Sequence, residues 1–71
     1  MRNDVRRRRM SAGWSQQRLA ELLGVTRLTV ISIEKGRFDP SLPLAFRIAA
    51  VFDSAIEDIF DPAGDAGEER P

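Results

Sequence analysis

The stretch TRLTVIS, residues 26–32, places hydrogen-bonding and apolar side chains on one short predicted helix. With a rotation of about 100° per residue, Val30 and Ile33 lie on the buried side of this helix, and Leu28 lies on the outward side. Arginine and serine can donate hydrogen bonds to base edges in the major groove of DNA, and leucine or isoleucine can contact the thymine methyl group. The candidates for such base contacts are Arg27, Leu28, Ile31 and Ser32.

Three interpretations of Leu28 and Ile31 are open. They contact thymine methyl groups, or they form an exposed apolar patch that binds another protein, or they are ordinary surface residues without a function. We favour the first interpretation. Because a leucine cannot discriminate between bases as a bidentate hydrogen-bonding pair does, we then expect modest sequence selectivity.

Charge is segregated along the chain although the net charge is zero. Residues 1–37 contain nine Lys and Arg against three acidic residues, a net charge of +6. Residues 38–71 contain two Arg against eight acidic residues, a net charge of −6. A basic half that faces a polyanion and an acidic half that faces away are typical of a nucleic-acid-binding protein.

Catalytic and metal-binding chemistry has little support in the composition. Cysteine and histidine are both absent, which removes disulfides, the commonest metal ligands and Cys- or His-based catalysis. The acidic residues have no base, nucleophile or glycine-rich phosphate loop to accompany them. We therefore expect no enzymatic activity, no cofactor and no metal.

A chain of 71 residues forms one domain at most and is only marginally stable alone. Without disulfides or a metal, we expect self-association to supply the additional stability, so we predict a homodimer. No apolar run approaches the roughly 20 residues that span a bilayer, and no segment resembles a secretory signal. We expect a soluble, cytoplasmic protein without a membrane partner.

Wherever the sequence has a clear hydrophobic period, that period is helical, so we predict an all-α fold. Ser15 and Thr26 are good N-caps, and Gly24 between them suits the end of a helix, which together predict a helix-turn-helix over about residues 16–35. Ser41 caps a fourth helix. The five predicted helices cover about residues 3–12, 16–23, 27–35, 42–52 and 55–60, followed by a flexible acidic tail at 62–71.

Four segments carry a family resemblance: GWSQQRLAELLGVTR, IEKG, RFDPSLPLAF and IEDIF. Together they resemble the Cro/repressor-type (XRE) helix-turn-helix family of bacterial and phage transcriptional regulators. The resemblance covers about residues 3–60 and implies a compact five-helix Cro/repressor-like domain over residues 1–61. It also implies a sequence-specific regulator, which we expect to be a repressor that binds a near-palindromic site on double-stranded DNA as a dimer.

The resemblance assigns roles residue by residue. Gln16 matches a family glutamine that fixes a DNA phosphate at a helix N-terminus. Arg27, Leu28 and Ser32 match positions that read base edges in relatives. Arg9 and Glu34 match a pair that ties the first helix to the end of the third. The expected contacts to the DNA backbone are Gln16, Gln17, Thr29, Lys35 and Arg37.

The sequence departs from the family pattern at several positions. Relatives usually carry glutamine where Leu28 stands and a small polar residue where Ile31 stands. They often carry glycine in place of Asp53 and a capping serine in place of Ala55, which weakens the prediction of the fifth helix. The apolar residues in and after this helix can close the core or form a dimer seam, and the dimer-interface candidates are Ile56, Ile59 and Phe60.

Other side chains are interpreted structurally. We expect Trp14 to lie in the core, Arg8 to lay its methylenes on the core with its guanidinium in water, and Arg6 or Arg7 to add long-range attraction for DNA. Two alternatives to the DNA-binding regulator are kept. One is a protein-interaction module with Leu28 and Ile31 as its binding face, and the other is an antitoxin-type autoregulator whose tail binds a toxin.

Overall fold

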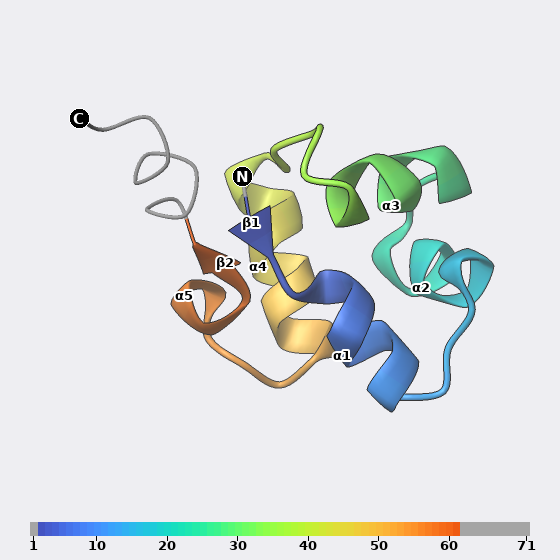
Figure 1. Cartoon of the computed structure of the whole chain (residues 1–71), viewed down its shortest axis with the longest axis horizontal. Helices are drawn as coiled ribbons and strands as arrows, with labels where there is room; N and C mark the ends of the chain where they lie inside the picture. The colour runs from blue at the N-terminus through green and yellow to red at the C-terminus, as the bar shows by residue number, and fades with distance from the viewer. Residues whose placement is uncertain (1, 62–71) are drawn as a thin grey trace.

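The computed structural model describes residues 2–61 (Figure 1). The elements are β1 (Arg2–Asn3), α1 (Val5–Ser11), α2 (Gln16–Leu23), α3 (Arg27–Glu34), α4 (Leu42–Val51), α5 (Ile56–Ile59) and β2 (Phe60–Asp61). α2 and α3 lie together at one end of the molecule, and the strands and α5 lie at the other. The predicted five-helix fold is confirmed, while the predicted tail at 62–71 lies outside the described residues.

Side-chain caps set the starts of the three central helices, as the sequence predicts. Ser15 Oγ accepts a hydrogen bond from the Arg18 backbone N–H at 3.0 Å, and Thr26 Oγ1 accepts one from Thr29 N–H at 3.3 Å. Ser41 Oγ caps α4 in the same way. Gly24 ends α2 with φ 73°, a left-handed conformation that costs glycine nothing sterically.

One hydrophobic core joins all five helices. Its largest fully buried side chains come from α1, α2, α3 and α4, and they are Val5, Leu19, Leu23, Val30, Ile33 and Ile48. Trp14, predicted to lie in the core, lies at its rim beside Phe52 instead. Both side chains are half-buried, and their rings stack with centroids 5.7 Å apart.

The N-terminus differs from the predicted helix over 3–12. Residues 2–3 pair antiparallel with residues 60–61, with Asn3 opposite Phe60. Asn3 Oδ1 accepts from the Val5 N–H at 3.1 Å, and Asn3 Nδ2 donates to the Ile33 carbonyl at 2.9 Å, so α1 begins at Val5. A two-residue ladder has no period that a sequence pattern can reveal.

The C-terminal elements correct part of the predicted dimer interface. Ile59 is 2% exposed and Phe60 is 4% exposed within a single chain, because the pairing of β2 with β1 closes the core over them. Their side chains therefore offer no surface to a partner. Only Ile56, the third candidate, is half-buried and keeps some accessible surface.

The guanidinium of Arg8 is not free in water, contrary to expectation. Its Nε lies 3.0 Å from Asp4 Oδ1, its Nη1 donates to Ser54 Oγ at 2.6 Å, and its Nη2 donates to the Asp58 carbonyl at 3.4 Å. Asp4 is only four residues away, but Ser54 and Asp58 come from a distant part of the chain, which a helical wheel cannot show. Arg8 thereby ties α1 to the segment around α5.

No helix within residues 2–61 combines the length and apolar character needed to cross a membrane.

Candidate nucleic-acid interface

The outward face of α3 is open to solvent at its N-terminal end. Val30 and Ile33 are buried against the core, as predicted, while the Leu28 side chain is 74% exposed. Arg27 is also exposed. Ile31 and Ser32 are half-buried, so they lie more toward the flank of α3 than at its crest.

The candidates for backbone contact lie at the start of α2, in the first turn of α3 and just after α3. Gln16 and Gln17 form the first residues of α2, and Gln17 is exposed with its Nε2 3.4 Å from Glu21 Oε2. Thr29 is half-buried in the first turn of α3. At the other end, the exposed Lys35 and Arg37 follow the helix. An extended polyanion across α3 would pass both groups.

A buried ion pair holds the two sides of this surface together. Arg9 Nε lies 2.7 Å from Glu34 Oε2, and Arg9 Nη1 donates to the Trp14 carbonyl at 2.7 Å. Gln16 Nε2 donates to Glu34 Oε1 at 3.2 Å, which links the start of α2 to the end of α3. Because the Glu34 carboxylate is neutralised inside the subunit, it contributes little repulsion toward an approaching anion.

Apart from Arg2, the cations of residues 2–61 divide into two groups according to whether they pair with a carboxylate. Arg7, Arg8, Arg9 and Arg18 each form an ion pair with a carboxylate. Within residues 2–61, five cations form no ion pair, and these are Arg6, Arg27, Lys35, Arg37 and Arg47. All except Arg47, which belongs to α4, border α3 or the loop after it.

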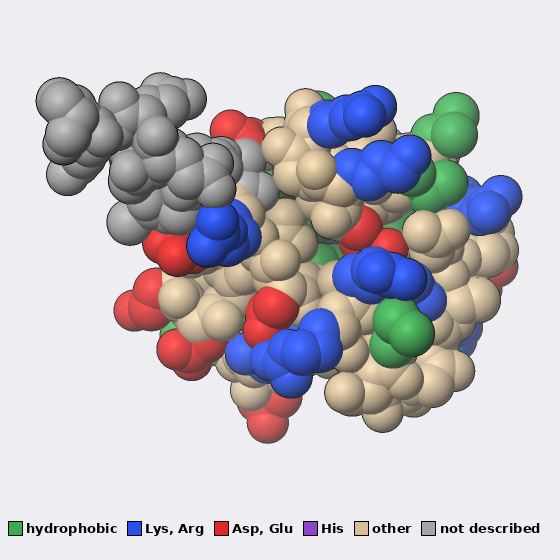
Figure 2. All heavy atoms as spheres, in the orientation of Figure 1, with side chains coloured by type: hydrophobic (Ala, Val, Ile, Leu, Met, Phe, Trp, Pro, Cys, Tyr) green, Lys and Arg blue, Asp and Glu red, His purple; other side chains and the backbone are tan. Residues whose placement is uncertain are grey.

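Figure 2 shows this arrangement on one face of the molecule. Lys and Arg side chains gather over α3 and the adjoining part of α1, near a few apolar side chains, and others lie beside β1 and lower on α1, next to acidic side chains. Asp and Glu side chains gather over α5, at the other end of the face. The segregation of charge along the sequence thus becomes a segregation in space. The sequence left Arg6 and Arg7 as equal candidates for the attraction of DNA. In the structure Arg7 pairs with Asp4, whereas Arg6 forms no ion pair within residues 2–61.

No group of three or more His, Cys, Asp or Glu side chains in the described part of the chain is placed to hold a metal ion.

Comparison with known proteins identifies the family of the chain. The family described as Helix-turn-helix (HTH_3) matches residues 5–59. The HTH-type transcriptional regulator MJ0272 of Methanocaldococcus jannaschii is 52% identical over 60 residues, which are 84% of this chain and 91% of that protein. An HTH-type transcriptional regulator of Methanothermobacter thermautotrophicus is 54% identical over 61 residues, covering 84% and 88%. The regulator YgzD of Bacillus subtilis is 48% identical over 60 residues, covering 84% and 91%.

Two solved structures share the fold. The restriction-modification controller protein C.AhdI from Aeromonas hydrophila superposes with a TM-score of 0.71 at 32% identity, covering 79% of this chain and 85% of that one. The hypothetical transcription factor NHTF from Neisseria also gives a TM-score of 0.71, at 27% identity and with 92% and 76% covered. The chain belongs to the XRE-type helix-turn-helix family of transcriptional regulators.

Proposed function

We propose that this protein is a sequence-specific repressor that places α3 in the major groove of double-stranded DNA. One observation carries the proposal: the accessible face of α3 is bordered by four cations, Arg6, Arg27, Lys35 and Arg37, that form no ion pair within residues 2–61. A cation left without a carboxylate keeps its full attraction for phosphate. A major groove about 12 Å wide admits a helix such as α3.

Base contacts and backbone contacts would have separate roles. Arg27 and Ser32 would donate hydrogen bonds to base edges, while Leu28 at the crest and Ile31 at the flank would contact thymine methyl groups. These residues would decide which sequence is preferred. The backbone contacts, which set affinity and register without reading sequence, would be Gln16, Gln17, Thr29, Lys35 and Arg37.

We propose a two-fold dimer whose seam is on α4. Leu42 and Phe46 are 64% and 58% exposed, and Ala50 is also exposed. Residues spaced four apart lie on one face of a helix, so these three side chains form an apolar stripe. A dimer interface formed by this stripe and Ile56 would bury exposed apolar surface. Ile59 and Phe60 cannot contribute to it, because they are buried within the subunit. Two copies about 34 Å apart would then fit a near-palindromic operator.

Repression is the mode of action that we propose for such a dimer, because a small protein seated in the groove blocks other proteins from the same DNA. The alternative of a protein-binding face formed by Leu28 and Ile31 has weaker support. Ile31 is half-buried, so Leu28 and Ile31 do not form a fully exposed apolar patch of the kind that binds another protein. The proposed antitoxin role depends on residues 62–71, outside the described part of the chain.

The test is selection of bound fragments from a random duplex pool, followed by gel-shift titration of the most enriched duplex at several salt concentrations. We expect an enriched site with two inverted half-sites about one helical turn apart. If a dimer neutralises about six phosphates, log K should fall against log salt with a slope near −5. An affinity independent of salt, or no DNA binding at all, would contradict the proposal.

A further inference from the structure

A hollow of about 340 Å³ lies between α1 and the flank of α3, beside the proposed recognition surface. It receives side chains from α1, from the first residue of α2 and from the C-terminal half of α3 with its cap. The lining residues are Arg6, Gln16, Ile31, Glu34 and Lys35. The hollow is thus built by three segments that only the folded chain brings together.

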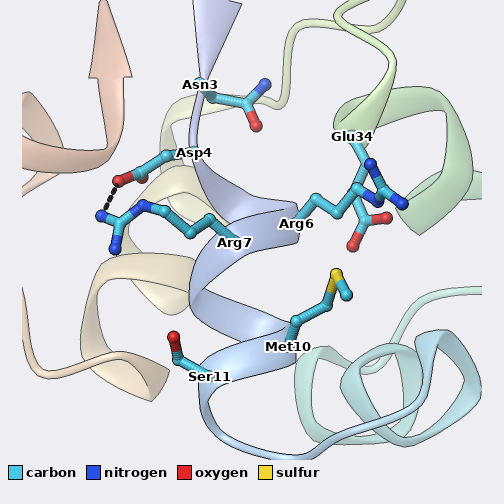
Figure 3. Close-up of a pocket in the computed structure, with 7 residues that line it drawn as sticks. All are labelled: Asn3, Asp4, Arg6, Arg7, Met10, Ser11 and Glu34. Carbon is cyan, nitrogen blue, oxygen red and sulfur yellow. Dashed lines mark hydrogen bonds and ion pairs between the residues drawn. The ribbon is translucent and has the colours of Figure 1, made fainter.

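Arg6 and its neighbour Arg7 leave α1 in opposite directions (Figure 3). Arg7 points toward Asp4, with which it forms an ion pair, whereas Arg6 points toward Glu34 at the end of α3. Arg6 makes no ion pair or side-chain hydrogen bond to any residue in 2–61. Its guanidinium is therefore available to a ligand.

The hollow carries a net positive charge, because its acidic residue is already paired within the subunit. Glu34 is the acidic residue of the lining, but its carboxylate accepts from Arg9 and from Gln16 and its side chain is 3% exposed. Arg6 and Lys35 have no such partner within the described residues. The hollow therefore presents two uncompensated positive charges beside the Gln16 end of α2, whose free backbone N–H groups also favour an anion.

The chemistry of the lining suits a phosphodiester oxygen. A guanidinium presents its donors in a planar fork that matches phosphate oxygens, and a lysine ammonium adds a point charge. Ile31 supplies an apolar wall, which removes water from one side and strengthens the electrostatic attraction. A free inorganic phosphate would meet the same groups, but the hollow opens beside α3, where a duplex in the groove places its backbone.

We propose that Arg6, together with Lys35, clamps a backbone phosphate of the bound duplex, so that α1 takes part directly in DNA binding. This inference rests on the proposed function and extends it to a helix and a residue outside the predicted contact set. Arg6 would add affinity and fix the depth of α3 in the groove, without reading bases. Arg7, one residue away in the same helix, would have no such role.

The experiment compares Arg6→Gln with Arg7→Gln on the full chain. Both substitutions remove one positive charge from adjacent positions of α1, so long-range electrostatics change almost equally. The probes are the duplex selected from the random pool and one duplex of unrelated sequence, each titrated at several salt concentrations. Inorganic phosphate, added as a competitor at constant ionic strength, reports whether the hollow binds the free anion instead.

With Arg6→Gln, we expect affinity for both duplexes to fall about tenfold for each bound monomer, since each monomer loses a charge-assisted hydrogen bond. The magnitude of the salt slope should fall by about 0.9 per monomer. Arg6→Lys should keep the wild-type slope, because the charge remains. Arg7→Gln should leave the slope nearly unchanged. Thermal unfolding should not distinguish Arg6→Gln from the wild type, because Arg6 has no intramolecular partner to lose.

Other outcomes overturn the inference. If Arg6→Gln and Arg7→Gln weakened binding equally, Arg6 would act only through general electrostatic attraction. If neither weakened binding although Arg37→Gln did, Arg6 would lie outside the interface. If inorganic phosphate weakened DNA binding by the wild type, while Arg6→Gln left DNA affinity unchanged, the hollow would be a site for the free anion. If the wild-type protein binds neither duplex, the proposed function itself fails, which is distinguishable from all of these results.

Discussion

Arg9 Nε lies 2.7 Å from Glu34 Oε2, and this pair joins α1 to the last residue of α3 in a nearly water-free position. The side chains of Arg9 and Glu34 are 11% and 3% exposed. A second bond, from Gln16 to the same carboxylate, brings in the start of α2. The orientation of the proposed recognition helix thus depends on a charge pair as well as on apolar packing.

Replacing Arg9 by alanine should strongly destabilise the fold. The Glu34 carboxylate would remain buried without its cation, and removing one partner of a buried pair costs about 3–5 kcal/mol. Glu34→Gln, which keeps an oxygen acceptor and removes the charge, should cost about 1–3 kcal/mol. Urea unfolding followed by circular dichroism measures both. Equal, small losses in the two variants would contradict the proposed contribution of the pair.

Leu28→Ala should change base preference without changing stability. Since the side chain is 74% exposed, the free energy of unfolding should shift by less than about 0.5 kcal/mol. Fragment selection with the variant should show relaxed preference at one or two positions, whereas Leu28→Gln should introduce a preference for adenine. Arg37→Gln is the control, because it should weaken binding to all sequences alike. An unchanged selected site with Leu28→Ala would argue against a methyl contact.

Phe46→Glu should convert the proposed dimer to a monomer. It places a charge in the middle of the apolar stripe on α4, and an unpaired charge in an interface is costly. Met10→Glu is a matched control, since Met10 is also 58% exposed but lies on α1. Sedimentation equilibrium measures the association. A wild-type chain that stays monomeric at high concentration, or a Met10→Glu variant that dissociates equally, would exclude α4 as the seam.

Asp53→Gly should stabilise the fold. Asp53 has φ 51°, in the left-handed region where a side chain costs free energy and glycine does not. We expect a gain of about 0.5–1 kcal/mol, limited by the larger entropy of glycine in the unfolded chain. Asp53→Ala removes the same carboxylate and keeps the strain, so it should give no gain. A gain with alanine equal to that with glycine would point to charge rather than backbone conformation.

The stability contribution of Asp4 should depend on pH. Burial raises the pKa of this carboxyl, but hydrogen bonds and charge from Arg7 and Arg8 outweigh it and hold the pKa below the ordinary value of 3.8. Because the pKa is lower in the folded state, the stabilising contribution of Asp4 is complete above the ordinary pKa of 3.8. It is lost as the pH falls through the folded-state pKa. The difference in unfolding free energy between the wild type and Asp4→Asn, about 1 kcal/mol or less at pH 7, should shrink in acid. A difference that grows on acidification would contradict this sign.

The sequence by itself determined the central helices, because their signals are local. Ser15, Thr26 and Ser41 each cap a helix through a backbone N–H only three residues away, and Gly24 closes α2 within the same segment. The buried positions of α2 and α3 follow from the helical period. Such features need no knowledge of the rest of the chain.

Only the tertiary structure decided features that depend on distant partners. The pairing of Asn3 with Phe60 starts α1 late and buries the C-terminal apolar residues, which removes two of them from a dimer surface. Within the run of arginines at 6–9, the sequence could not separate Arg7, which pairs with Asp4, from Arg6, which lines the hollow beside α3. Four identical side chains acquire different roles because Ser54 and Glu34, which bond to Arg8 and Arg9, come from segments that only folding brings close, while Arg6 has no ion-pair partner within residues 2–61.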